Sequence, residues 1–461
     1  FCCGVSFTVL GVKDFAAIVP SIIAGALTCL VLFLLGKSTD DLRTGMWAAV
    51  ILIVNPFHVM YSRLALTDVL YVFFFTAAVL AGIYAWKKNR WWLYMLPGFL
   101  AGLAMNTKYS GFLPLALVFG YFIFAAILEI VERLIKHEQE GESWKSVFIN
   151  RMKHLLPGMT ASVILFVLLY AHWYINVDKK MGYDNLLEHH RGYGKSAAEA
   201  FAAFKNNPWE MLFYFRQWSF PALILLPLGL IASIWKWKRS YIILYAWLAF
   251  YYIGLFFYER YTRLALPLIP AICFFGGIFL SRAFLLLESK WKDGGKLLPK
   301  VEYITAALVV VMGFIRLFPV LSMDTDHYRK ANRSIRENYA DKGVVIRDTL
   351  ACFNFYATKD WPLFAPHPRL VNFLKTDNPK YFVFDEHLTW SAQRMDFYEY
   401  NRKRLKTMEK IPVNRYEPIW LEPFSRGKFI EMKKNPKQFR RHFNMYIYHT
   451  EKPCRIPPSW K

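Results

Sequence analysis

Charged residues in the connections between apolar stretches are the part of this sequence most suited to chemistry. Arg63 and Asp68 lie in residues 61–68, directly after an apolar stretch that an Asn-Pro pair interrupts. Because proline ends or kinks a helix, we expect this segment to form a turn beside a helix end, where the Asp68 carboxylate could meet a ligand. Alternatively, Thr67 or Asp68 caps the following helix with Arg63 as its ion-pair partner. Both interpretations can hold together.

Two further connections carry positive charges. Lys108 lies in a turn rich in small residues, where the alternative is a lysine that simply extends to the membrane surface. Residues 258–263 hold Glu259, Arg260 and Arg263 between two apolar stretches. Glu259 can neutralise only one of the two arginines, and basic side chains beside lipid need an anionic partner. A lipid phosphate is therefore an expected ligand for the other arginine.

These residue types together fit the transfer of a sugar from a lipid phosphate. When the glycosidic bond of a polyprenyl-phosphate sugar breaks, the departing phosphate becomes more negative, and fixed Lys and Arg charges stabilise it. They could take the place of a divalent metal. The acceptor hydroxyl must lose its proton, for which a carboxylate is the expected general base. We predict that Asp68 is the site carboxylate and that the donor phosphate is bound by Arg63, Lys108, Arg260 and Arg263.

The elements that position these residues are predicted to be transmembrane helices. About 20 apolar residues cross the hydrocarbon core as a helix, and the chain has about ten such stretches. They are residues 15–36, 44–60, 69–86, 91–107, 111–130, 155–177, 218–235, 241–258, 264–286 and 303–321. The alternative, a soluble protein with all of these helices buried, would need helices with almost no polar face.

Composition supports a polytopic α-helical membrane protein. The 461 residues are 55% hydrophobic and 18% aromatic, yet carry a net charge of +23, which fits neither a soluble globule nor a disordered chain. Basic residues number 2, 3, 5, 3 and 4 in the alternate connections 37–43, 87–90, 131–154, 236–240 and 288–302. Such connections face the cytoplasm. The candidate site residues are therefore expected on the outer face.

A second domain is predicted after residue 322, where no stretch is long enough to span a membrane. Strand-like runs at 343–346, 381–384 and 443–448 and a helical pattern at 327–339 predict an extracytoplasmic α/β domain over 323–461, with the membrane domain over 1–322. This domain has 27 Lys and Arg against 16 Asp and Glu. The excess indicates contact with anionic headgroups or an acidic partner, or simply a solvated basic surface.

The long outer connection, residues 178–217, supplies weaker candidates. Tyr183, His189 and His190 could contact donor or acceptor if this loop covers the site, whereas a solvated loop is the alternative. Its mixture of acids and histidines could bind a metal, but no Cys/His spacing is typical of a zinc site. Walker, GxGxxG and GxSxG motifs are absent from the sequence. We therefore predict no metal, no cofactor and no nucleic-acid partner.

The order of these motifs resembles a known family, the GT-C glycosyltransferases of family 39. That family includes dolichyl-phosphate-mannose:protein mannosyltransferases and lipid A aminoarabinose transferases. The resemblance covers about residues 1–320. The residues that carry it are Asp14 to Ser21 with Gly25, Gly45 to Ala49 followed by Asn55-Pro56, Tyr61 to Arg63 with Asp68, and Gly102 to Ala104 with Thr107 and Lys108.

The resemblance implies roles for individual residues. Asp68 matches an outer acid that helps to organise the site, and the basic candidates match positions assigned to the carrier phosphate. The main base of the family is an acid in the first outer loop, ahead of the span equivalent to 15–36. Because this chain begins at Phe1-Cys2-Cys3-Gly4 without an initiator Met or signal peptide, we expect that loop to be missing, with Asp14 too close to the span to replace it. The resemblance also implies inversion at the anomeric carbon in one displacement.

The sequence thus predicts a membrane glycosyltransferase that moves a hexose or pentose from a polyprenyl phosphate to a protein, lipid or glycan at the outer face. It would lie in a cytoplasmic membrane, or in the endoplasmic reticulum of a eukaryote, among membrane lipids. Two alternatives are a noncatalytic scaffold of envelope assembly and a transporter of lipid-linked sugars, which would carry inverted repeats and charges near the bilayer midplane. The sugar, the acceptor, the dolichyl or undecaprenyl carrier and the oligomeric state are not readable from the sequence.

Overall fold

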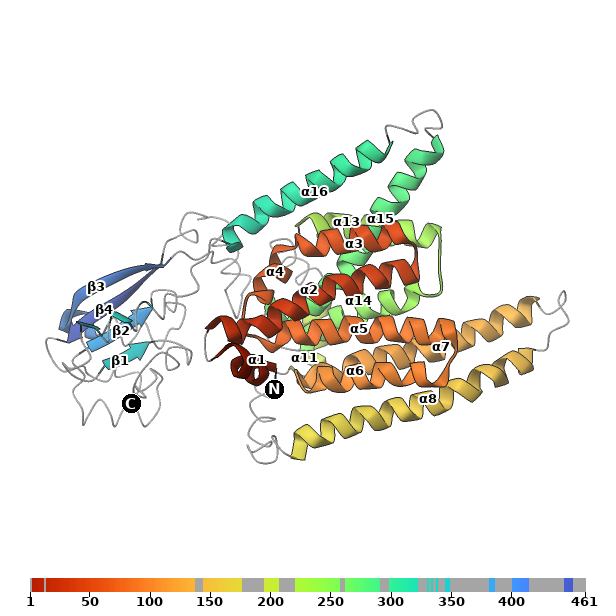
Figure 1. The fold of residues 1–461 in the computed structure, drawn as a ribbon, viewed down its shortest axis with the longest axis horizontal. Coiled ribbons are helices and arrows are strands. Elements are labelled where there is room, and N and C mark those ends of the chain that lie inside the picture. The colour runs from red at the N-terminus through yellow and green to blue at the C-terminus, as the bar shows by residue number, and fades with distance from the viewer. Residues whose placement is uncertain are drawn as a thin grey trace. The chain divides into compact units, whose positions relative to one another are not determined.

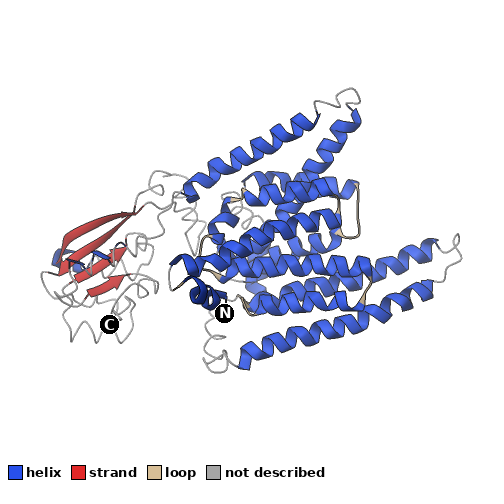
Figure 2. Ribbon diagram, in the orientation of Figure 1, coloured by secondary structure: helices blue, strands red, loops and turns tan. Residues whose placement is uncertain are grey.

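The computed structural model describes two compact units, Phe1–Val320 with Leu421–Arg426, and Leu321–Trp420 with Gly427–Lys461. The first is helical and the second contains a β-sheet (Figures 1 and 2). The described residues are 2–11, 14–136, 144–175, 195–206, 220–257, 262–290 and 298–321, and, in the second unit, 330, 333–334, 337–338, 345–348, 381–385, 400–413 and 443–450.

The first unit is built from α-helices joined by short 3-10 turns. The helices are α1 (Cys2–Leu10), α2 (Asp14–Thr39), α3 (Leu42–Ile53), α4 (Pro56–Ser62), α5 (Thr67–Lys88), α6 (Leu96–Met105), α7 (Leu113–Lys136), α8 (Trp144–Trp173), α11 (Ala197–Asn206), α13 (Phe220–Trp235), α14 (Tyr241–Gly254), α15 (Ile269–Lys290) and α16 (Leu298–Leu321). The 3-10 turns are η1 (Trp91–Met95), η2 (Tyr109–Phe112), η4 (Leu255–Phe257) and η5 (Thr262–Leu268).

Helical structure lies at each of the ten predicted stretches. Five helices within the described ranges are long and apolar enough to cross a membrane, and the pair α3 and α4, bent by 64°, would make a sixth. Three shorter apolar segments are Trp91–Met105, Ile224–Trp235 and Tyr241–Phe257. The polytopic helical fold is therefore confirmed, while the number of ten spans stays a prediction.

Three helices differ from the sequence-based expectation. α1 forms ahead of the first predicted stretch. α8 begins at Trp144, well before the predicted start at 155, because a helix can continue past the hydrocarbon core into the polar region. α11 forms inside the connection predicted as a loop. Its N-terminus is a capping box, since Ser196 Oγ accepts a hydrogen bond from Glu199 N (3.3 Å) and the Glu199 carboxylate accepts one from Ser196 N (2.8 Å).

The core of the helical unit forms around α2, α3, α5 and α15: α3 packs against α2 and α15, and α2 also packs against α5. Large aromatic side chains fill it: Phe75 stacks on Trp247 with ring centroids 4.8 Å apart, and both side chains are almost completely buried. In contrast, α8 and α16 expose many large apolar residues, among them Leu168, Ile304 and Ile315. Lipid is the solvent that such a surface requires, as expected for an integral membrane protein.

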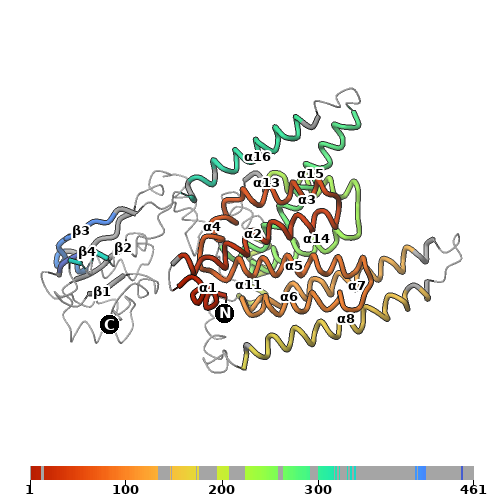
Figure 3. The backbone as a smooth tube through the Cα atoms, in the orientation of Figure 1, coloured from red at the N-terminus to blue at the C-terminus, as the bar shows by residue number. Residues whose placement is uncertain are grey.

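Two hydrogen bonds join α2 to α5, one near the start of both helices and one near the end of both. Ser21 Oγ donates to Leu66 O (3.1 Å), which joins the start of α2 to the start of α5. Lys87 Nζ donates to Ser38 O, which joins the ends of the same helices. α2 and α5 therefore run in the same direction (Figure 3). The candidate residues in 61–68 consequently lie at one end of these two helices, and the turn at 40–41 lies at the other end.

The second unit contains a mixed four-stranded sheet in the order β1-β2-β4-β3. Its strands are β1 (Val345–Asp348), β2 (Tyr381–Asp385), β3 (Leu405–Val413) and β4 (Phe443–Thr450). β1 is parallel to β2, and β4 is antiparallel to both β2 and β3. Three strands fall at or within two residues of the predicted runs. β3 was not predicted, because its Lys and Glu residues interrupt the apolar pattern. Of the predicted helix 327–339, residues 330, 333–334 and 337–338 are described and helical.

Candidate active site

Asp68 lies in the first turn of α5, where the positive end of the helix dipole favours a carboxylate. Its side chain is 7% exposed and forms an ion pair with Lys108 Nζ. The N-cap of α5 is Leu66, which makes no side-chain capping bond, so the alternative in which Thr67 or Asp68 caps this helix is contradicted. The physical reason is that the Asp68 carboxylate accepts a hydrogen bond from Lys108, 40 residues later in the chain, instead of from a backbone N–H group of its own helix.

Lys108 reaches Asp68 from the connection between α6 and α7. This connection is tight: a Cβ atom at Gly111 would overlap the backbone of Met105 and Ala104, so only glycine fits there. The chain therefore folds back directly after α6 and directs Lys108 towards α5. Its side chain is 21% exposed and paired. It is not a lone lysine that extends to the membrane surface.

Tyr71 holds the Lys108 turn from the side of α5. Its hydroxyl donates to Ser110 O (3.0 Å), and Lys108 Nζ lies 5.9 Å from the centroid of its ring. The Tyr71 side chain is fully buried, one helical turn after Asp68. The ring can stabilise the ammonium group through its π face. Asp68 and Tyr71 thus fix Lys108 through two different interactions.

Two polar atoms beside Lys108 have unused hydrogen-bonding capacity. Among the described residues, Asn106 Oδ1 and Ser110 Oγ are buried side-chain atoms without a hydrogen-bond partner. Buried polar groups are normally paired, and unpaired ones indicate a place for a water molecule or ligand. The Asp68–Lys108 pair therefore lies in a turn that could still bind a further polar group.

Arg63 and Arg263 belong to elements that pack close to this pair. Arg63 is the C-cap of α4, and Arg263 lies in η5, which packs against both α4 and α5. Both side chains are partly exposed. Arg260 lies outside the described residues, as do Tyr183, His189 and His190. The structure thus brings the elements of Arg63, Asp68, Lys108 and Arg263 together and is silent on the other four.

The outer connection approaches the site elements through α11. Lys195 N donates to Phe257 O (2.8 Å), five residues before Thr262 and the start of η5, and the rings of Phe204 and Phe256 meet edge to face at 5.3 Å. The described part of this connection is therefore docked on η4, immediately before the segment that contains Arg260. No group of three or more His, Cys, Asp and Glu side chains suited to a metal occurs within the described ranges.

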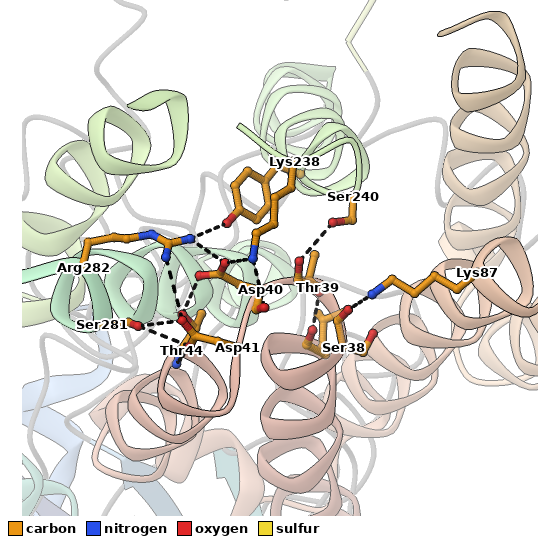
Figure 4. Close-up of polar contacts among 12 residues, drawn as sticks. Ser38, Thr39, Asp40, Asp41, Thr44, Lys87, Lys238, Ser240, Ser281 and Arg282 are labelled. Atoms are coloured by element: carbon orange, nitrogen blue, oxygen red, sulfur yellow. Dashed lines mark hydrogen bonds and ion pairs between the residues drawn. The ribbon is translucent and has the colours of Figure 1, made fainter. Parts of the chain in front are cut away.

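A second charged cluster lies at the other end of the helices (Figure 4). We define the Asp40 cluster as Asp40, Asp41, Thr44, Lys238 and Arg282. The Asp40 side chain is fully buried and pairs with Lys238 and with Arg282 Nη2 (2.5 Å), and Thr44 Oγ1 donates to its second oxygen (2.7 Å). Asp41 caps α3 by accepting from Thr44 N (2.6 Å). The cluster joins the turn 40–41 to α15 and to the connection before α14.

The environment of Asp40 acts on its acidity in opposite directions. Burial raises the pKa of the Asp40 carboxyl, but hydrogen bonds from Lys238 and Thr44 and the charges of Arg282 and Lys238 lower it by more. The net pKa lies below the usual range, so the carboxylate stays ionised and paired. Asp40 and Arg282 were not predicted, because only the two basic residues of the connection 37–43 were considered and Arg282 lies within the apolar stretch 264–286.

Three residues close to the candidate site were also missed: Ser21, His58 and Tyr71. His58 is buried in α4, and its ring Nε2 lies 3.1 Å from Gly25 O. A histidine within an apolar stretch, two residues after the Asn55-Pro56 pair, was the available signal. Ser21 lies in a motif that contributed to the family resemblance, but its bond to Leu66 O depends on the distance between two helices, which no local pattern gives.

Comparison with known proteins agrees with this fold. Residues 1–138 match the model of a family described as dolichyl-phosphate-mannose-protein mannosyltransferase. No curated protein sequence matches the chain. The crystal structure of ArnT from Cupriavidus metallidurans bound to undecaprenyl phosphate is similar with a TM-score of 0.54 and 11% identity, covering 97% of this chain and 86% of that one.

A second similar structure is the oligosaccharyltransferase AglB from Archaeoglobus fulgidus in complex with an inhibitory peptide and a dolichol-phosphate. Its TM-score is 0.50 at 14% identity, and the match covers 83% of this chain and 60% of AglB. The chain therefore spans less than two thirds of the length of AglB. At these identities the likeness concerns the fold.

The chain shares its polytopic helical fold with ArnT and AglB. The resemblance to the GT-C glycosyltransferases inferred from the sequence is confirmed, as a resemblance, by the family match over residues 1–138 and by this shared fold. The matched segment includes Arg63, Asp68 and Lys108.

Proposed function

We propose that this chain is a membrane glycosyltransferase that moves a sugar from a polyprenyl phosphate to a protein, lipid or glycan acceptor on the outer face of the membrane. The observation that carries the proposal is the Asp68–Lys108 pair. It lies in the segment that matches the mannosyltransferase family model, at the end of the helices where Arg63 and Arg263 are also located. The ArnT and AglB structures of the same fold hold polyprenyl phosphates.

In this proposal the basic residues stabilise the leaving group. The acceptor atom attacks the anomeric carbon, the bond between that carbon and the phosphate oxygen breaks, and the electron pair leaves with the phosphate. Lys108, Arg63 and Arg263 would face the charge that grows on the phosphate, and Arg260 is proposed as a fourth contact. Inversion at the anomeric carbon in one displacement follows from the family resemblance.

Asp68 is better suited to organise the site than to accept the acceptor's proton. Its carboxylate is almost buried and already bonded to Lys108. A general base would have to give up that ion pair during the reaction, whereas an organising acid keeps it. We therefore propose that Asp68 orients Lys108 towards the phosphate and that a different acidic residue accepts the proton.

The test is release of polyprenyl phosphate by the full-length protein, including any segment that precedes Phe1, in lipid nanodiscs, with a panel of dolichyl- and undecaprenyl-phosphate sugars as donors. We expect wild-type turnover with one donor and a loss of about 100-fold in Asp68→Asn and Lys108→Ala. Glu132→Gln is the matched control, because Glu132 forms an ion pair with Arg239 outside the candidate site. Turnover unaffected by the two site variants would refute these roles.

The panel also separates the proposed transferase from the other function classes. No turnover with any donor, together with equal donor binding by wild type and variants, would favour a noncatalytic scaffold of envelope assembly. Movement of the intact donor between leaflets without release of its phosphate would favour a transporter.

A further inference from the structure

The turn between α4 and α5 is fastened to α2 at three points. Ser21 Oγ donates to Leu66 O (3.1 Å), the N-cap residue of α5. His58 Nε2 lies 3.1 Å from Gly25 O. Ser62 Oγ, which donates to His58 O (2.8 Å), packs against Gly25 so closely that a Cβ atom there would lie 2.8 Å from Ser62 Cβ. Only glycine at position 25 permits this contact.

The His58 side chain joins α4 directly to α2. It is 3% exposed, and its partner Gly25 O is a carbonyl, which can only accept a hydrogen bond. The ring hydrogen is therefore on Nε2, which donates to α2. On the other side of the residue, His58 N donates to Asn55 Oδ1 (3.0 Å), the cap of α4.

The short helix α4 transmits this contact to the candidate site. It has seven residues, follows a 64° bend after α3, and ends directly before Arg63, its C-cap. A helix this short has little stability of its own, so its direction depends on what it packs against. His58 fixes α4 against α2, and thereby fixes where the backbone of Arg63 leaves the helix and where α5 begins.

We propose that His58 is a positioning residue for the donor-phosphate site. Its Nε2–H···O=C bond to Gly25 holds Arg63 and the first turn of α5, which carries Asp68, in the relation that Lys108 needs to bind a polyprenyl phosphate. His58 does not touch the reacting atoms. The inference rests on the proposed glycosyltransferase function and adds a residue to it.

The test compares His58→Leu and His58→Gln in the full-length protein in nanodiscs, with the donor found in the panel. His58→Leu removes the bond to Gly25 O, whereas the amide of His58→Gln can still donate to it. We expect His58→Leu to raise the KM for the donor by about tenfold with a smaller change in kcat, and His58→Gln to restore the KM to within about threefold of wild type. A positioning role predicts this rescue.

Thr28→Val is the matched control for a buried hydrogen bond on the same helix. Thr28 is fully buried and donates to Ala24 O (2.7 Å) within α2, without joining α2 to α4. We expect this variant to leave the donor KM unchanged even if it lowers the Tm. If His58→Leu lowers the Tm without a selective rise in the donor KM, as expected for Thr28→Val, His58 is merely structural and the proposal fails.

Binding of undecaprenyl phosphate and dolichyl phosphate, measured by native mass spectrometry, keeps the test informative if His58→Leu folds poorly. Ser21→Ala removes the hydrogen bond to Leu66 O in the same turn, and we expect it to weaken binding of these polyprenyl phosphates by about threefold. Unchanged binding in both Ser21→Ala and His58→Leu would overturn the proposal. Absence of donor turnover by the wild type would instead overturn the proposed function, so the two failures are distinguishable.

Discussion

The Asp68 pair and the Asp40 cluster use the same kinds of residues for different ends. Asp40 is surrounded by two cations and a hydroxyl group, and Asp41 caps a helix and accepts from Ser281 Oγ (3.1 Å). Asp68 has one lysine, in a turn where Asn106 Oδ1 and Ser110 Oγ have no partner among the described residues. A buried carboxylate therefore says little about function until its surroundings are known. The Asp40 carboxylate, which pairs with both cations of its cluster although Arg282 Nε has no hydrogen-bond partner among the described residues, fits a structural joint. The turn around Lys108, with two unpartnered oxygen atoms, fits a binding site.

The largest expected effect is on stability, at the Asp40 cluster. Asp40→Asn leaves Lys238 and Arg282 without their carboxylate, and we expect a loss of about 3 kcal/mol in the free energy of unfolding. The figure is at the lower end for a buried pair, because the Lys238 side chain is 39% exposed and can reach water. Denaturant unfolding followed by helical circular dichroism measures it. If Asp40→Asn and Asp68→Asn lowered the free energy of unfolding equally, the Asp40 cluster would not differ from the Asp68 pair in its structural role.

The next effect is on activity, at the Asp68 pair. If Asp68 acts by orienting Lys108, the two residues act as a unit, and their substitutions should not be additive. We expect Asp68→Asn and Lys108→Met each to lower kcat/KM for the donor by about 100-fold, and the double variant to lose little more than either. Steady-state release of polyprenyl phosphate gives all four values. Full additivity, about 10,000-fold in the double variant, would assign the residues independent roles.

Acid should weaken the Asp40 cluster. Burial raises the folded-state pKa of Asp40, but the hydrogen bonds from Lys238 and Thr44 and the charges of Arg282 and Lys238 together lower it by more, so it lies below its ordinary value. Its contribution to stability is therefore fully present above the unfolded-state pKa of about 4 and is lost as the pH falls through the folded-state pKa. We expect the Tm to fall between about pH 5 and about pH 3 in the wild type, and to fall less steeply in Asp40→Asn. Parallel curves would show that other groups govern acid unfolding.

The predictability of the two regions from sequence differs for physical reasons. The helices were predictable because an apolar run of about 20 residues is typical of a helix in contact with lipid. Asp68 and Lys108 were found because charges at the ends of such runs are conspicuous. The ion pair between them was not predictable, because residues 68 and 108 meet only where α5 packs beside the α6–α7 connection. Asp40 was overlooked for the same reason: its partners lie about 200 residues later, at Lys238 and Arg282.

The smallest expected effect is on donor binding, at Tyr71. This buried side chain tests whether the candidate site includes residues of the core beyond Lys108. Tyr71→Phe removes the hydroxyl bond to Ser110 O and keeps the ring beside Lys108. One neutral hydrogen bond contributes about 1 kcal/mol, so we expect the donor KM to rise by about threefold to fivefold, with the ammonium–ring contact intact. Tyr245→Phe is the control, because the Tyr245 hydroxyl donates to a backbone carbonyl, Leu230 O (3.2 Å), and contacts Ser233 Oγ, both away from Asp68. Equal effects on KM in both variants would mean that Tyr71 acts only through general stability and that the site ends at Lys108.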